Sequence, residues 1–219
     1  MKQTDNKTLI ITGGNIKEDF LIELLKTNGY SMIIAADNGL TTADRLNIPL
    51  DFIVGDFDSV PHEILEKYQN KSTPIETFPT EKDKTDTQIA IELALMHNPS
   101  EIDIIGATGS RLDHVLANVH LLVLPLQVGV RACMFDTNNK IYLMKESFHL
   151  TKAKQYGTYV SLLPFTEQVS GLTLKGFKYP LNQIVLIAGS SLGISNEIIE
   201  EEAKVEFTDG ILLVMETRD

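Results

Sequence analysis

The sequence predicts an α/β protein in two parts: an N-terminal, mostly parallel sheet flanked by helices, then a C-terminal antiparallel β-sandwich or barrel. Two observations support this prediction. From Thr8 to about Phe135, short β-branched runs alternate with longer segments of helical periodicity. Beyond about Asp136, apolar and polar residues alternate and long helical segments are lacking. We therefore expect an α/β catalytic domain over residues 1–138 and a β domain over residues 139–219.

The first half should contain six strands separated by five helices. The strands are expected over residues 8–12, 31–37, 51–56, 74–78, 101–107 and 130–135, and the helices over 16–29, 40–47, 61–69, 85–98 and 112–127. Thr85 followed three residues later by Gln88 matches a capping box. Asp86 should therefore lie in the first turn of the fourth helix, where the helix dipole favours the ionised carboxylate.

The second half should be built from antiparallel strands. Alternating runs occupy residues 140–147, 156–165, 172–177, 183–189 and 203–217. Within the last run, Asp209 and Gly210 form the dipeptide that is typical of a two-residue β-hairpin turn, so a hairpin is expected there.

Composition excludes several classes of function. The formal net charge of −11 has the wrong sign for attraction to a nucleic-acid backbone, so no nucleic-acid partner is expected. The single cysteine, Cys133, rules out an internal disulfide and a multi-cysteine zinc site. No signal-peptide pattern opens the sequence, and Pro125 interrupts the longest apolar stretch, VHLLVLPLQVGV, which is too short to span a bilayer. A cytoplasmic protein without a membrane partner is expected.

Acidic side chains follow several expected strands. Asp37 ends the second strand, Asp56 and Asp58 lie two residues apart at the end of the third, and Asp86 opens a helix. On an extended backbone, i and i+2 side chains point to one face, so Asp56 and Asp58 could share one cation. Hard cations such as Mg²⁺ take carboxylate, phosphate and water oxygens. Aspartates that cap turns are the simpler alternative for each residue alone.

The segment GATGSRLDH brings a second group of polar residues to the next junction between a strand and a helix. Gly106 and Gly109 could let backbone N–H groups approach phosphate oxygens, and the Arg111 guanidinium could add a forked contact. The alternative is a surface arginine paired with the helix-cap carboxylate of Asp113. Neither GxxxxGK[ST] nor GxGxxG after the first strand occurs, which excludes a P-loop or dinucleotide-binding enzyme.

Taken together and in order, seven motifs resemble the thiamin pyrophosphokinase family. They are AADNGL, IVGDFDSV, KDKTDTQIAIELAL, GATGSRLDHVLAN, VSLLPF, GFKYPL and GISNE, and they extend from about residue 11 to the end of the chain. The resemblance implies transfer of pyrophosphate from ATP to thiamin, which gives thiamin diphosphate and AMP. It also implies a homodimer with thiamin pockets at the subunit interface.

The resemblance assigns roles to individual residues. It implies catalytic positions at Asp37, Asp56, Asp58, Asp86, Arg111 and Asp113, metal ligands at Asp56, Asp58 and Asp86 for Mg²⁺, ATP contacts at Lys82, Asp83, Gly106, Gly109 and Arg111, and thiamin contacts at Tyr179, Ser195 and Asn196. Tyr179 stands where some members have tryptophan. The general base stays open between Asp113 and Asp37.

Two other functions remain open at this point. The segment DFDSV satisfies the nucleophile pattern DxDx[TV] of haloacid-dehalogenase-like phosphatases, in which Asp56 would be a covalent nucleophile. Against this reading, the motif lies on the third expected strand and no later GDxxxD pair occurs. A non-enzymatic sensor that binds nucleotide or thiamin is the other alternative.

Overall fold

The computed structural model describes residues 6–58, 60–69, 74–77 and 84–219. The chain forms two compact units that divide between Thr137 and Asn138. Each unit has its own buried apolar core. Within the described ranges, no helix combines the length and the apolar character needed to cross a membrane.

The first unit is a six-stranded sheet in which every pairing is parallel. Its strands are β1 (Lys7–Ile11), β2 (Tyr30–Ala36), β3 (Phe52–Gly55), β4 (Ile75–Thr77), β5 (Glu101–Ile105) and β6 (Arg131–Phe135). They lie in the order β6-β5-β1-β2-β3-β4. From β1 the chain adds β2, β3 and β4 on one side, and it then adds β5 and β6 on the other side of β1. The strand order therefore reverses between β1 and β5. Ligands of open parallel sheets collect beyond the strand ends near such a reversal.

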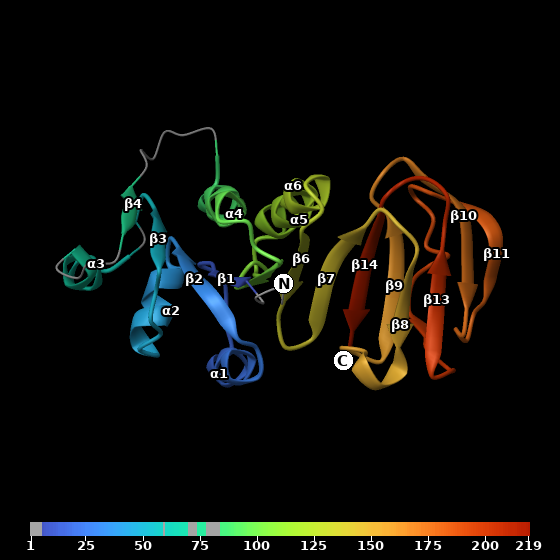
Figure 1. Ribbon diagram of the computed structural model, residues 1–219, viewed down its shortest axis with the longest axis horizontal. Helices are drawn as coiled ribbons and strands as arrows, with labels where there is room; N and C mark the ends of the chain where they lie inside the picture. Colours follow the sequence, from blue (N-terminus) through green and yellow to red (C-terminus); the bar gives the residue numbers. More distant parts are fainter. Residues whose placement is uncertain (1–5, 59, 70–73, 78–83) are drawn as a thin grey trace, which may run out of the picture. The chain divides into compact units, whose positions relative to one another are not determined.

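Helices cover both faces of this sheet. They are α1 (Glu18–Thr27), α2 (Gly39–Arg45), α3 (His62–Gln69), α4 (Asp86–Met96), α5 (Leu112–Leu121) and α6 (Val123–Gln127). Leu21 of α1 and Ala43 of α2 pack with Leu9, Ile11 and Ile33 of the sheet, and α4 packs on β1, β2 and β3. Figure 1 shows α1 and α2 on one face and α4, α5 and α6 on the other. The predicted helical layers are confirmed.

One expected helix is in fact two. The segment 112–127 was predicted to be continuous, but α5 ends at Leu121 and α6 begins at Val123. Pro125 explains the break, because proline has no N–H with which to continue the helical hydrogen bonds to the turn before it. The helix therefore restarts after Leu122, whose carbonyl accepts from Leu126 N.

The second unit consists of two antiparallel sets of strands. Its elements are β7 (Asn139–Met144), β8 (Phe148–Thr151), the 3₁₀ turn η1 (Lys152–Lys154), β9 (Tyr159–Pro164), β10 (Gln168–Lys175), β11 (Leu181–Ile187), β12 (Asn196–Glu197), β13 (Glu202–Glu206) and β14 (Leu212–Thr217). One set has the order β12-β9-β14-β7 and the other β11-β10-β13-β8. Alternate residues of β13 and β14 are buried, including Ala203, Val205, Leu212 and Val214.

The predicted hairpin at Asp209 and Gly210 is wrong. β13 pairs with β10 and β8, whereas β14 pairs with β7 and β9, so this turn joins two sheets. The connection is held by β10 instead, because Ser170 N donates to the Asp209 carbonyl at 3.0 Å. Gly210 has φ 99°, and a Cβ there would lie 2.5 Å from the Gln168 carbonyl oxygen. The glycine was a correct turn signal, but long-range pairing decided which strands it connects.

Candidate active site

Three aspartates converge at the carboxyl ends of β2 and β3. Asp37 directly follows β2 and Asp56 directly follows β3, and the Asp37 amide donates to the Val54 carbonyl at 2.9 Å. Each of Asp37, Asp56 and Asp58 offers a carboxylate oxygen, and these oxygens lie within 4.8 Å of one another. The parallel pairing of two neighbouring strands therefore brings together acids that are far apart in the sequence.

A turn, and not an extended backbone, brings Asp58 beside Asp56. Phe57 has φ 61° and Asp37 has φ 49°, both in the left-handed region that costs energy for residues other than glycine. The Phe57 ring is 5% exposed and packs into the core with Ile53 and other apolar residues. The expected convergence of the two carboxylates is thus found, although the reason given for it was wrong. A buried ring between them anchors the turn.

The carboxylates of this group repel one another. The pKa of Asp58 is raised, chiefly by the negative charge of Asp56, then by desolvation and the charge of Asp37, with a smaller effect of Asp86. The Asp58 amide donates to Asp56 Oδ1 at 3.2 Å, which holds the two residues together. Clustered carboxylate oxygens, open to solvent at Asp58, are the ligands that a hard divalent cation takes. The residues therefore fit such an ion.

Asp86 lies near this group but outside its compact set of oxygens. It is the first residue of α4, and Thr85 caps that helix by accepting from Gln88 N at 3.3 Å. The Gln88 side chain donates to Glu92 and does not complete the expected capping box. The charge of Asp86 reaches Asp58, on which it raises the pKa. Asp37 takes the third place in the compact group, and a ligand role for Asp86 stays a prediction.

Arg111 and Asp113 form an ion pair at the start of α5. Arg111 Nη2 donates to Asp113 Oδ2 at 2.7 Å and Nε donates to Oδ1 at 3.3 Å. These contacts, with the His114 amide, lower the pKa of Asp113 to about 2, so this carboxylate is a weak proton acceptor. The pairing with a helix-start aspartate is the one that the surface alternative predicted. Both side chains are nevertheless largely exposed, and the guanidinium stays accessible to a phosphate.

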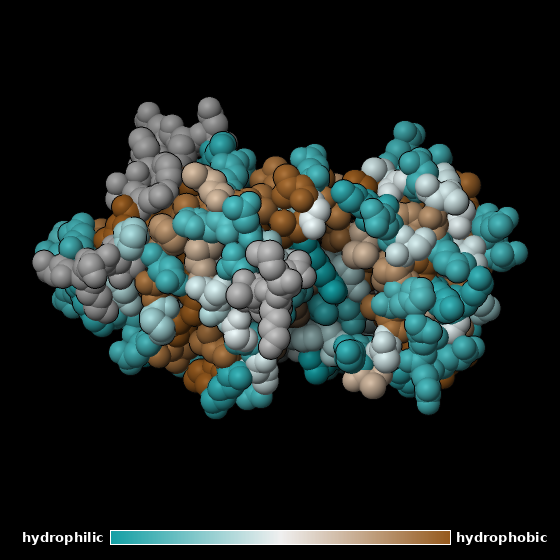
Figure 2. Space-filling model, viewed as in Figure 1, coloured by the Kyte–Doolittle hydropathy of each residue, from teal (hydrophilic) through white to brown (hydrophobic). Residues whose placement is uncertain are grey.

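Two leucines of α5 close in sequence to this pair are exposed. Leu112 and Leu116, one helical turn apart on α5, are 72% and 62% exposed. Figure 2 shows apolar surface over α5 and α6. Contiguous apolar surface of this kind is a candidate place for a ligand or another protein to bind.

The predicted phosphate glycines have different surroundings. Gly106 is buried, with φ 80°, and a Cβ there would lie 2.5 Å from the Thr12 carbonyl oxygen. Close packing of the β1 and β5 ends therefore explains this glycine without a ligand. Gly109 is exposed, with nothing within 4 Å of a Cβ. Lys82 and Asp83, the other expected ATP contacts, lie outside the described residues.

Gly13 is a site residue that sequence reasoning missed. A Cβ at this position would lie 3.2 Å from Asn38 Cβ and 3.5 Å from Asp37 Oδ2. The bare backbone after β1 thus borders the carboxylate group. The signal was available in the pair Gly13-Gly14 directly after the first strand, but it does not match a standard nucleotide motif.

The predicted thiamin residues lie together in the second unit. Tyr179 is 57% exposed and Asn196 is 4% exposed, and the Tyr179 amide donates to Asn196 Oδ1 at 3.0 Å. Ser195 is exposed and has φ 56°. Its amide donates to Ser161 Oγ at 3.0 Å, which ties the segment to β9. The structure thus brings these three residues to one place.

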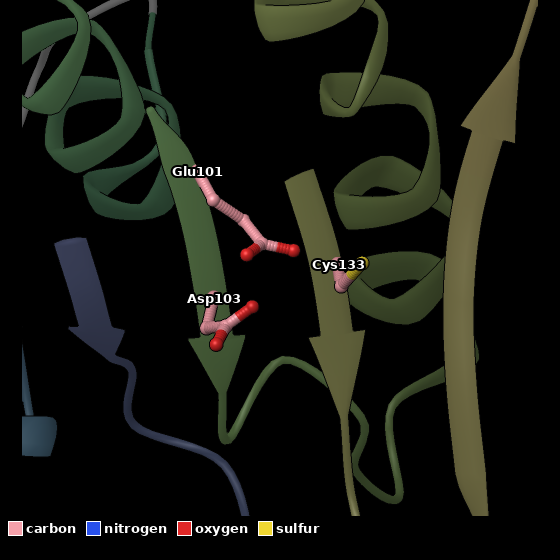
Figure 3. Close-up of side chains that lie close together, drawn as sticks. All are labelled: Glu101, Asp103 and Cys133. Atoms are coloured by element: carbon pink, nitrogen blue, oxygen red, sulfur yellow. The ribbon is translucent and has the colours of Figure 1, made fainter. Parts of the chain in front are cut away.

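A second group of possible metal ligands lies on the strands β5 and β6. Figure 3 shows Glu101, Asp103 and Cys133 on neighbouring strands β5 and β6. Lys7 Nζ lies 2.8 Å from Glu101, and the Tyr30 hydroxyl donates to Asp103 Oδ2 at 2.6 Å. Because Lys7 pairs with Glu101 and the Tyr30 hydroxyl donates to Asp103, we interpret the group as part of the scaffold. Alternation of acids with apolar residues in EIDII could have revealed it.

Comparison with protein families matches both units of the chain. Residues 24–134 match the model of the thiamin pyrophosphokinase catalytic domain, and residues 145–212 match the model of the thiamin pyrophosphokinase vitamin B1 binding domain. A thiamine pyrophosphokinase of Bacillus subtilis is 34% identical over 216 residues, which is 97% of this chain and 100% of the relative.

Solved structures give the same result. A crystal structure of thiamine pyrophosphokinase from Bacillus subtilis has a TM-score of 0.87 at 30% identity, covering 98% of this chain and all of that one. A thiamin pyrophosphokinase structure from Geobacillus thermodenitrificans has a TM-score of 0.83 at 32% identity, with 97% and 98% covered.

Proposed function

The chain belongs to the thiamin pyrophosphokinase family, and on this premise we propose that it transfers the pyrophosphoryl group of ATP to the hydroxyethyl oxygen of thiamin. The products are thiamin diphosphate and AMP. The observation that carries the proposal is the convergence of Asp37, Asp56 and Asp58 at the carboxyl edge of the sheet, in a chain whose two units match the catalytic and the vitamin-binding models of one family.

The carboxylate group is the proposed site of a divalent cation, and we assign it to Mg²⁺. Asp37, Asp56 and Asp58 would hold the ion, with Asp86 as a further ligand or as a charge that tunes the group. When bound, the ion supplies positive charge to the triphosphate and to the leaving AMP oxygen. The left-handed turn at Phe57 supports this assignment, because it keeps the acids in place before the ion arrives.

The remaining chemistry belongs to side chains that bind and orient. The alcohol oxygen of thiamin attacks the β-phosphorus, and the bond from that phosphorus to the α-phosphate oxygen breaks. We assign phosphate binding to Arg111, held by Asp113, and to Lys82, and a further ATP contact to Asp83. Because the pKa of Asp113 is about 2, this carboxylate is a weak acceptor for the alcohol proton. Alignment of alcohol and phosphate supplies the rest.

We assign thiamin binding to the second unit and propose that the protein works as a homodimer in the cytoplasm. Tyr179 presents an exposed aromatic ring, and Ser195 lies beside Asn196 at the same place. The exposed Leu112 and Leu116 support dimerisation, since a second copy would remove them from water. Size-exclusion chromatography with light scattering tests this part, and a monomeric mass at micromolar concentration would contradict it.

The two alternative functions are not supported. A phosphatase of the haloacid-dehalogenase type would use Asp56 as its nucleophile, but the chain matches another family over both of its units. A sensor without turnover would give no chemical reason for the group of carboxylates. Trapping of a phosphoaspartate on Asp56 would revive the first alternative.

One assay tests the proposed reaction. The purified protein is incubated with thiamin, Mg²⁺ and ATP, and AMP is separated from ADP. We expect AMP and thiamin diphosphate in equal amounts, whereas ADP would indicate a simple kinase and contradict the proposal.

Two variants test the assigned site. Asp56→Asn should retain the fold and lose activity by roughly a hundredfold or more, because the amide is a poorer ligand for the cation. Asp19→Asn, which changes an exposed aspartate on α1, is the matched control and should keep wild-type activity. Near-normal AMP formation by Asp56→Asn would contradict the assignment.

A further inference from the structure

Two connections of the second unit, residues 176–179 and residues 196–199, run side by side. Lys178 N donates to the Glu197 carbonyl and Ile199 N donates to the Gly176 carbonyl, each at 2.9 Å. Phe177 and Ile198 form an isolated bridge between them. Both bridge residues are buried, so apolar packing fixes the base of this two-stranded junction.

The amide side chain of Asn196 closes the end of the junction. Asn196 Nδ2 donates to the Tyr179 carbonyl at 2.8 Å, and Tyr179 N donates back to Asn196 Oδ1 at 3.0 Å. Oδ1 also accepts from Glu197 N at 3.0 Å. One side chain thus engages both backbone polar groups of Tyr179. With 4% of its surface exposed, Asn196 has little surface left for a ligand.

The neighbouring residues differ from Asn196 in exposure. Tyr179 is 57% exposed, and Ser195 is exposed while its backbone is bound to Ser161. Among the described residues, the Ser195 hydroxyl has no hydrogen-bond partner. The Lys178 ammonium pairs with Glu197 and lies 5.7 Å from the Tyr179 ring centroid. The ring and the hydroxyl therefore face outward, and the amide faces inward.

We propose that Asn196 is a positioning residue, which does not touch thiamin and acts on thiamin binding only through Tyr179. Its two hydrogen bonds fix the backbone from which the aromatic ring projects. A ring held in one place before binding loses less conformational freedom when the substrate arrives. This inference rests on the proposed function, because it takes Tyr179 as a contact of thiamin, and it changes the role that the sequence resemblance implied for Asn196.

A double-mutant cycle separates action through Tyr179 from direct contact. Thiamin binding is measured by calorimetry for wild type, Tyr179→Ala, Asn196→Ala and the double variant. We expect each single change to weaken binding by about tenfold, and the double variant to be no weaker than Tyr179→Ala, because residues that act as one unit are not additive. The KM for ATP should be the same in all four proteins. The KM for thiamin should be higher in the three variants than in wild type.

Two further variants control for loss of folding. Asn196→Asp keeps the acceptor for Tyr179 N and Glu197 N but places a carboxylate oxygen against the Tyr179 carbonyl, so it should weaken thiamin binding at least as much as Asn196→Ala. Asn182→Ala, at an exposed position on β11, should bind thiamin as wild type does. Thermal unfolding of each variant shows that it is folded at the temperature of the measurement.

Each remaining outcome overturns the inference. Additive losses in the double variant mean that Asn196 touches thiamin directly, and an unaffected single variant means that one of the two residues has no part in binding. Failure of the proposed function is a separate result: wild type would then form no AMP from thiamin and ATP. Wild-type AMP formation with an additive cycle rejects only the positioning role.

Discussion

The Asp58 amide donates a hydrogen bond to Asp56 Oδ1 at 3.2 Å, although the charge of Asp56 raises the pKa of Asp58. The turn between them thus holds together two groups that repel each other once ionised. Phe57 makes this arrangement possible by burying its ring while adopting a left-handed backbone. Stability of the fold does not explain why such a repulsive pair is present. Binding of a cation between the two carboxylates does explain it.

The first prediction is that Asp58→Asn stabilises, or leaves unchanged, the metal-free protein. A carboxyl whose pKa is raised by folding binds its proton more tightly in the folded state. Above the raised pKa, the ionised Asp58 therefore lowers the stability of the fold, and asparagine removes that effect at neutral pH. The melting temperature without metal, measured at neutral pH in chelator, should be equal to or above that of wild type.

The same variant should lose the response to metal. Saturation of wild type with Mg²⁺ at a hundred times its dissociation constant adds about 2.7 kcal/mol, which raises the melting temperature by about 5–10 °C for a chain of this size. Asp58→Asn should show less than half of that shift. A full shift in the variant would mean that the ion binds without Asp58.

Sequence patterns predicted the parts of the site that depend on local chemistry. Asp56 and Asp58 end an apolar run, and Thr85 caps α4 and places Asp86 in its first turn. These signals act within a few residues, so one segment is enough to reveal them. The choice of Asp37 as the third member of the compact group depends instead on β2 lying beside β3, which is a long-range relationship.

Two of the errors also come from long-range relationships. The turn at Gly210 was recognised, but its strands belong to different sheets because each found a better partner elsewhere. The left-handed turn at Phe57 was missed, because phenylalanine carries no local preference for it and only its burial in the core imposes it. The break between α5 and α6 is different, because Pro125 is a local signal from which the sequence alone could have predicted it.

Gly39→Ala should both destabilise the protein and impair its activity. A Cβ at this position would lie 2.0 Å from the Ile11 carbonyl oxygen, so α2 would have to move away from β1. Such overpacking costs about 1–3 kcal/mol. Because the Leu40 amide donates to the Asp37 carbonyl, the movement should also disturb the carboxylate group. Urea unfolding and AMP formation per folded molecule measure the two effects.

Gly29→Ala is the matched control for this change. Gly29 is exposed, a Cβ there meets nothing within 4 Å, and its backbone is not left-handed. The substitution should leave the free energy of unfolding unchanged or raise it by about 0.4–1 kcal/mol, because alanine lowers the conformational entropy of the unfolded chain. Equal destabilisation by both variants would show that the contact between α2 and β1 is not the cause.

Asp113→Asn should lower activity without moving the acid limb of the pH profile. Because its pKa is depressed to about 2, Asp113 contributes stability above its unfolded pKa, and this contribution is lost only as the pH falls toward 2. The carboxylate thus stays ionised throughout a profile between about pH 5 and 9. Arg111 would lose its orienting partner, and we expect kcat/KM to fall by about tenfold to a hundredfold. Disappearance of the acid limb would instead identify Asp113 as the general base.

The last prediction concerns the group of Glu101, Asp103 and Cys133 on β5 and β6. Burial and the charge of Asp103 raise the pKa of Tyr30, so its hydroxyl stays a donor to that carboxylate throughout the working pH range. Tyr30→Phe removes a charge-assisted hydrogen bond from an acid that is 4% exposed, which should cost roughly 1.5–3 kcal/mol of unfolding free energy. Tyr30 lies at the start of β2, whereas Asp37 follows its end. The variant should therefore keep wild-type kcat and KM below its melting temperature. Reduced kcat in the folded variant would mean that this group, which we interpret as scaffold, is coupled to the reaction.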